Sequence, residues 1–147
     1  MIQITAPAGE TPYAGTMPSK QTPPTRPLVL VIEDDPRIQE LLEEMLTMSG
    51  YRVQATDSAL GAAALVRRLR PDAVLLDLGL PYRSGATVLQ EIKLDPQTRD
   101  VPVVIVSAMT ETLSPERRAL ADAVLSKPVS LNGLLTTLHR LTNDRAA

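Results

Sequence analysis

The stretch Leu28-Val29-Leu30-Val31-Ile32-Glu33-Asp34-Asp35-Pro36 decides the fold class. It begins with an unbroken apolar run and passes at once into acidic residues followed by proline. A short apolar run rich in β-branched residues predicts a strand that is buried on both faces. The Asp-Pro pair predicts that a helix starts directly afterwards. This stretch is therefore the first half of a β-α unit.

The same alternation continues along the chain. Further strands are predicted at 51–55, where apolar and polar residues alternate, and at the shorter, mainly apolar stretches 73–76, 103–106 and 123–126. Each of the five strands is followed by a helix signal. After the fourth strand the signal is the Ser-Pro start at 114–115. After the other four it is a set of apolar residues at helical spacing, in chain order Ile38, Leu41, Leu42, Met45 and Leu46; Ala62, Val66 and Leu69; Val88, Leu89 and Ile92; and Leu131, Leu134, Leu135, Leu138 and Leu141. Strands apolar on both faces and joined by helices require a parallel sheet covered on both sides. The sequence predicts an α/β fold, a doubly wound (βα)₅ domain with a five-stranded parallel sheet.

Composition narrows the functional classes. The chain has 147 residues, room for one domain, and a net charge of -2, which gives no electrostatic basis for binding nucleic acid or an anionic membrane. It has no cysteine, which excludes disulfides and thiolate sites. No apolar run approaches the roughly 20 residues of a membrane span, and the start lacks a secretory signal. We expect a cytoplasmic protein.

The domain boundaries follow from changes in composition. Residues 1–26 are rich in proline, threonine and glycine and lack apolar periodicity, which predicts a disordered N-terminal arm. The folded domain is expected at 27–142, followed by a short C-terminal tail at 143–147.

Polar side chains stand at the carboxyl ends of several predicted strands. They are Glu33, Asp34 and Asp35 after the first strand, Asp77 at the end of the third, Ser107 at the end of the fourth and Lys127 after the fifth. In a doubly wound sheet these ends meet at one edge, where ligands bind. Clustered carboxylates repel one another, and a hard divalent cation such as Mg²⁺ relieves that repulsion. A strand-end carboxylate beside a metal, an ammonium and a hydroxyl can accept a phosphoryl group.

Each residue also has a structural interpretation. Asp35 precedes Pro36, so we assign it to capping the following helix and not to the metal site. Ser107 alone could be an ordinary strand-end hydroxyl, and Lys127 alone a solvated amine. Asp77 is harder to explain structurally, because it ends an apolar run where a central strand leaves the core. The joint pattern carries the functional interpretation.

These residues resemble the receiver domain of bacterial response regulators, of the stand-alone type related to chemotaxis regulators. The resemblance covers about residues 27–142. It is carried by four pieces: Val31 to Pro36, Leu75 to Pro81 with Gly85, Val106-Ser107-Ala108, and Leu125 to Pro128. It implies the flavodoxin-like strand order 2-1-3-4-5 and a two-component phosphorelay.

The resemblance also implies roles and partners. Asp77 would be the phosphoacceptor, with Ser107 and Lys127 contacting the phosphoryl group. Mg²⁺ would be the cofactor, held by Asp34, with Glu33 beside it, by Asp77 and by the Gly79 carbonyl. Lys127-Pro128 would be a cis peptide bond. The partners would be a sensor histidine kinase or histidine phosphotransfer protein and a separate downstream effector, with no direct contact to nucleic acid or membrane.

Two departures from the family pattern concern the output mechanism. Three residues before the lysine, where the family usually has tyrosine or phenylalanine, this chain has Val124. The segment between Ser107 and Lys127 is shorter than usual, which predicts a trimmed fourth helix. Only a few residues follow the last helix, so we expect no appended output domain.

Two alternatives remain. An aspartyl-phosphate hydrolase of the haloacid dehalogenase type would carry an acid two residues after the nucleophile, where this chain has Gly79. We therefore expect that the protein is not an enzyme. A receiver-fold interaction module with weak or uncoupled phosphorylation is the closer rival, because Val124 favours it.

Overall fold

The computed structural model describes residues 25–146 and contains the predicted alternation of strands and helices. The strands are β1 (Leu28–Ile32), β2 (Arg52–Thr56), β3 (Ala73–Leu76), β4 (Val103–Ser107) and β5 (Ala123–Ser126). The helices are α2 (Pro36–Met48), α3 (Ala62–Leu69), α4 (Gly85–Leu94), α5 (Pro115–Arg118) and α6 (Leu131–Ala146), with a 3₁₀ turn, η2 (Thr110–Thr112). Nearly all of the arm predicted at 1–26 lies outside the described residues, so its disorder stays a prediction.

All strands pair in parallel in the order β2-β1-β3-β4-β5, which confirms the predicted fold class and strand order. The central strands β1, β3 and β4 are almost entirely buried, whereas the edge strands β2 and β5 are partly exposed. A continuous apolar run suits only a strand with a helix layer on each face.

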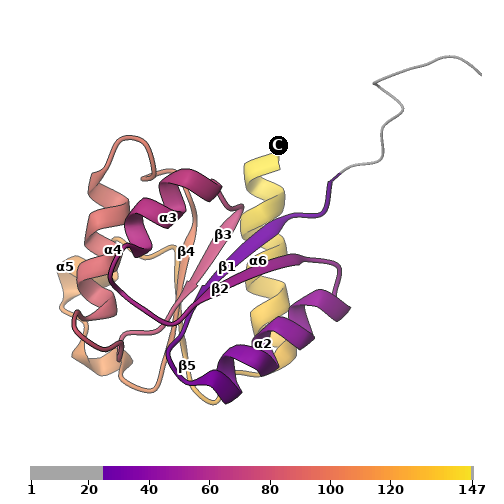
Figure 1. Ribbon diagram of the computed structural model, residues 1–147, viewed down its shortest axis with the longest axis horizontal. Coiled ribbons are helices and arrows are strands. Elements are labelled where there is room, and N and C mark those ends of the chain that lie inside the picture. Colours follow the sequence, from indigo (N-terminus) through magenta and orange to yellow (C-terminus); the bar gives the residue numbers. More distant parts are fainter. Residues whose placement is uncertain (1–24, 147) are drawn as a thin grey trace, which may run out of the picture.

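The helices form two layers around this sheet (Figure 1). Helices α2 and α6 lie on one side, and α3, α4 and α5 lie on the other. One core cluster joins the sheet to α2 and α6 through Leu42, Leu46, Leu134 and Leu138. The second joins it to α3 and α4 through Val66, Leu89 and Ile92. Aliphatic side chains, joined by Tyr51 on the α2 and α6 side, thus fill both layers without any phenylalanine or tryptophan.

Local signals define most helix starts. The side chains of Asp35, Ser84 and Ser114 cap α2, α4 and α5 by accepting backbone N–H groups. Helix α5 is only 4 residues long, as the short segment between Ser107 and Lys127 predicted.

The domain boundary expected at residue 142 stays a prediction. Helix α6 continues to Ala146, through most of the segment expected to be a tail. Leu141 and Thr142 are buried, and the Thr142 hydroxyl donates to the Leu138 carbonyl at 2.8 Å. These contacts hold the last described part of the helix against the core, up to the start of the segment expected as a tail.

One glycine determines how α4 meets β3. A Cβ atom at Gly85 would lie 2.0 Å from the Asp77 carbonyl oxygen and 2.8 Å from the Leu78 Cα. The Gly85 N–H also donates to the Leu78 carbonyl at 2.9 Å. The loop after β3 can close only because this position lacks a side chain.

We expect Gly85→Ala to destabilise the domain by about 1–3 kcal/mol, because the added methyl overlaps backbone atoms that cannot move freely. Chemical denaturation measures this loss. Gly79→Ala in the same loop is the control, because its Cβ would meet only the end of the flexible Met109 side chain, at 3.2 Å. Equal stability losses in the two variants would contradict the packing argument.

Candidate functional site

Asp77 stands at the carboxyl end of β3 and is 9% exposed. The Gly79 N–H donates to its Oδ1 at 3.3 Å, and Lys127 Nζ lies 3.3 Å from its Oδ2. Burial raises the pKa of Asp77, but the Ser107 hydroxyl, the Lys127 ammonium and the Gly79 N–H outweigh burial and hold that pKa below its ordinary value. The carboxyl group is therefore ionised although it is largely buried.

Glu33 lies at the carboxyl end of β1 and is 2% exposed. Its Oε1 lies 2.7 Å from Lys127 Nζ, and its Oε2 accepts the Asp35 N–H at 3.1 Å. Burial raises the pKa of Glu33 above its ordinary value, and the hydrogen bond from Lys127 opposes that shift. The side chain is thus held in place by partners on both of its oxygens.

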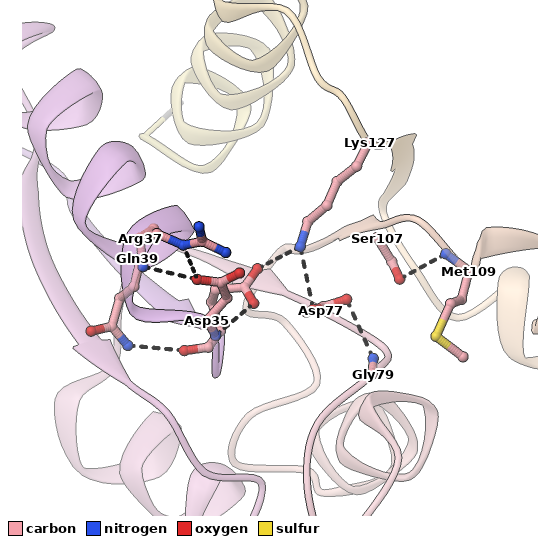
Figure 2. A network of polar contacts seen from close by, with 9 residues as sticks. Asp35, Arg37, Gln39, Asp77, Gly79, Ser107, Met109 and Lys127 are labelled. Carbon is pink, nitrogen blue, oxygen red and sulfur yellow. Dashed lines mark hydrogen bonds and ion pairs between the residues drawn. The ribbon is translucent and has the colours of Figure 1, made fainter.

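Lys127 connects the two carboxylates (Figure 2). It follows β5, and the next peptide bond, Lys127-Pro128, is cis, which confirms that expectation. Burial lowers the pKa of Lys127, but Glu33 and Asp77 together raise it above its ordinary value. The ammonium is therefore charged and points at the acidic cluster.

Asp34 completes the acidic cluster from the exposed side. Carboxylate oxygens of Glu33, Asp34 and Asp77 lie within 4.8 Å of one another. When ionised, these three carboxylates carry three negative charges, and the Lys127 ammonium balances one of them. A divalent cation would balance the remaining two. Oxygen ligands of this kind suit Mg²⁺, so the residues present fit the predicted metal.

Asp35 has the structural role predicted for it. Its Oδ1 accepts the Arg37 N–H at 2.9 Å, so it is the N-cap of α2. This hydrogen bond is the main reason why the pKa of Asp35 lies below its ordinary value. Of the two adjacent aspartates, Asp35 therefore caps α2, whereas Asp34 faces the acidic cluster.

Ser107 is fully buried at the end of β4. Its Oγ accepts the Met109 N–H at 3.1 Å, and its carbonyl accepts the Lys127 N–H at 3.0 Å. The first contact leaves the hydroxyl proton free to be donated toward Asp77. The second ties the end of β4 to the residue that carries the ammonium.

The structure brings together every predicted site residue: Glu33, Asp34, Asp77, Gly79, Ser107 and Lys127. Sequence reasoning did not identify two supporting contacts. Gln39 donates its side-chain amide to the Glu33 carbonyl at 2.9 Å, and the Met109 N–H orients Ser107. A polar residue on α2 and a backbone amide leave no pattern in the sequence that would reveal these contacts.

The sequence pattern of the response regulator receiver domain matches residues 29–139. The chain belongs to the response regulator receiver family. Receiver domains are modules of two-component signalling systems; they interact with histidine kinases and downstream effectors, and they bind Mg²⁺ at an acidic site. The acidic cluster described above agrees with that family property.

Named relatives fall in the same family. The polar-differentiation response regulator DivK of Brucella anthropi is 32% identical over 79% of this chain and 96% of its own length. The DNA-binding dual master transcriptional regulator RpaA of Synechocystis is 35% identical over 78% of this chain but only 48% of its own length. The receiver domain thus spans about half the length of RpaA.

Solved structures agree with the fold. A sensor protein from Polaromonas has a TM-score of 0.74 and 34% identity, covering 81% of this chain and 98% of that one. The receiver domain of the sensor histidine kinase PA1611 from Pseudomonas aeruginosa has a TM-score of 0.73 and 29% identity, covering 80% and 98%. That structure has a magnesium ion coordinated in its active-site cleft.

Within residues 25–146 of this receiver domain, no helix is long and apolar enough to cross a membrane.

We expect Asp34→Ala to weaken Mg²⁺ binding more than Asp35→Ala does, because only Asp34 faces the cluster. Asp35→Ala should instead lower the melting temperature by several degrees through loss of the cap. Amide NMR titration with Mg²⁺ measures the first effect, since the chain has no tryptophan to report binding by fluorescence. Equal losses of affinity with unchanged stability would refute this division of roles.

Proposed function

We propose that this receiver domain accepts a phosphoryl group on Asp77, with Mg²⁺, from a histidine kinase or a histidine phosphotransfer protein. It then signals through a separate partner protein. One observation carries the proposal: the Asp77 carboxylate stands at a strand end with the Lys127 ammonium 3.3 Å away and the Glu33 and Asp34 carboxylates beside it. Transfer of a phosphoryl group to a carboxylate requires such a nucleophile together with cations that stabilise the charge on the phosphoryl oxygens.

In the transfer, an oxygen of the Asp77 carboxylate forms a bond to phosphorus while the phosphorus–nitrogen bond of a phosphohistidine breaks. The product is an acyl phosphate, and the imidazole of the donor takes up a proton in place of the phosphoryl group. The lowered pKa of Asp77 keeps the nucleophile ionised. With a small phosphodonor such as acetyl phosphate, a phosphorus–oxygen bond breaks instead.

The neighbouring residues have distinct tasks in this proposal. Mg²⁺, held by Glu33, Asp34, Asp77 and the Gly79 carbonyl, would offset negative charge on the phosphoryl oxygens. Lys127 would move its ammonium from the Asp77 carboxylate to a phosphoryl oxygen. Ser107 would donate its hydroxyl proton to a second phosphoryl oxygen, while the Met109 N–H holds the hydroxyl oxygen in place.

The alternatives find less support in the geometry. Hydrolysis of the haloacid dehalogenase type needs an acid two residues after the nucleophile, and Gly79 has no side chain. Val124 is the one feature that favours an uncoupled interaction module, but the acidic cluster beside Asp77 opposes it, because Val124 affects only how the signal is passed on.

Acetyl phosphate with Mg²⁺ should add one phosphoryl mass to the protein, and Asp77→Asn should abolish that addition. Intact-protein mass spectrometry measures both. Asp95→Asn is the matched control, because Asp95 lies at the end of α4 and pairs with Arg67 away from the acidic cluster. Full labelling of Asp77→Asn would show that the assigned nucleophile is wrong.

Val124 concerns the output of the switch. It lies in β5 beside Ile105, is half-buried, and has neither a ring nor a hydroxyl to reorient. The neighbouring helix α5 has 4 residues. A phosphoryl group shifts the equilibrium between the inactive and active states only by as much as it favours one state over the other. Valine in place of the aromatic residue removes one contact that differs between these states, so phosphorylation should shift the equilibrium less.

We therefore expect beryllofluoride with Mg²⁺ to change amide signals around Asp77, Ser107 and Lys127, with changes that fade toward α5 and the edge strand β5. Val124→Tyr should extend the changes to that face. Large changes across the whole face in the wild-type protein would contradict the expectation, as would no gain in the variant.

A further inference from the structure

The loop between β3 and α4 is fixed at its base and strained at its tip. Gly85 packs against the Asp77 backbone, and the side chains of Leu78 and Leu80 are buried in the core. The Arg83 guanidinium pairs with Glu91 of α4. These contacts anchor both sides of the loop, so they hold its tip at a fixed place relative to Asp77.

Tyr82 lies at this tip in an unfavourable backbone conformation. Its φ is 70°, and the Arg83 N–H donates to the Pro81 carbonyl at 2.8 Å, which closes a γ-turn around Tyr82. The γ-turn with a positive central φ is the rare and strained form. Arg70 also has a positive φ, but it ends helix α3, where that conformation is common.

The fold gains no core packing from the tyrosine ring. Tyr82 is 85% exposed, and the hydrogen-bonding cap of α4 comes from Ser84. Glycine would adopt this φ without strain and would leave the buried parts of the loop unchanged. A large aromatic residue kept in a strained and exposed position indicates a role outside the fold.

The position of Tyr82 indicates which partner it contacts. Asp77 is only 9% exposed, so a donor protein must bring its phosphohistidine to the edge of the sheet and cover the surrounding loops. Tyr82 is on the loop that begins at Asp77. Because this loop is anchored on both sides, its tip is already in place in the unphosphorylated domain, which is the form that the donor binds.

We infer that Tyr82 is a specificity-determining contact for the protein that donates the phosphoryl group to Asp77. This inference rests on the proposed function. Tyrosine supplies a large contact area with few rotatable bonds, which suits it to protein interfaces. A small donor can reach Asp77 without touching the ring, so the two kinds of donor should respond differently to its removal.

The first test captures the partner in cells. In the full chain, Tyr82→p-benzoylphenylalanine keeps an aromatic side chain and permits photo-cross-linking. The expected adduct contains a histidine kinase or a histidine phosphotransfer protein, identified by mass spectrometry. The same substitution at Leu94, which is 64% exposed at the far end of α4, is the control and should give no such adduct. No adduct at Tyr82, or an adduct only with an output protein, overturns the inference.

The second test measures transfer rates with the captured donor, purified and autophosphorylated. Tyr82→Gly should lower the transfer rate at least about tenfold, as expected when an interface residue that contributes to binding is lost. It should leave labelling by acetyl phosphate unchanged and raise the melting temperature through relief of strain. Tyr82→Phe should transfer nearly as fast as the wild type, and Leu94→Ala is the control for loss of an exposed apolar side chain.

The outcomes separate the two proposals. If acetyl phosphate does not label the wild-type protein at Asp77, the proposed function fails. If it does label Asp77 and Tyr82→Gly accepts the phosphoryl group from the protein donor at the wild-type rate, only the role of Tyr82 fails. A Tyr82→Gly variant that is less stable than the wild type and slower with both donors would show that the tyrosine is structural.

Discussion

The Lys127 ammonium, held between Glu33 and Asp77, is the interaction on which the arrangement of the site depends. Glu33 is 2% exposed, and a buried carboxylate is unfavourable without a partner. Lys127 supplies that partner and lies at the start of the loop between β5 and α6. One ion-pair network therefore joins the carboxyl ends of β1 and β3 to a residue 94 positions after Glu33.

This network leaves an excess of negative charge at an edge where the rest of the fold is apolar. The two core clusters on either side of the sheet hold the strand ends in place. Rigid strand ends keep the carboxylates close despite their repulsion. A divalent cation would therefore bind more tightly to them than to carboxylates on flexible side chains. The stability of the sheet and the affinity of the acidic site are thus linked through the same strands.

Much of the site could be predicted from the sequence, because strand-end positions in a doubly wound sheet converge on one edge. Glu33, Asp77, Ser107 and Lys127 each end or follow an apolar run, so their convergence followed from the strand order. The capping role of Asp35 followed from its place before Pro36. The support from Gln39 and from the Met109 N–H did not, because side-chain reach and backbone amide direction leave no periodic signal. Tyr82 was missed for a similar reason, since a positive φ at a residue other than glycine has no sequence pattern.

The sequence by itself determined the alternation of buried strands and helices, since apolar runs and helical spacing reflect local burial on each face. It also determined which functional groups would stand at the active edge. Only the tertiary structure decided how far the end of α6 is buried, because Leu141 packs against the core cluster on the α2 side of the sheet. Only the tertiary structure decided the distances within the acidic cluster and the strained turn at Tyr82. Those features arise from contacts between segments far apart in the chain and from loop closure around Gly85, which no local pattern records.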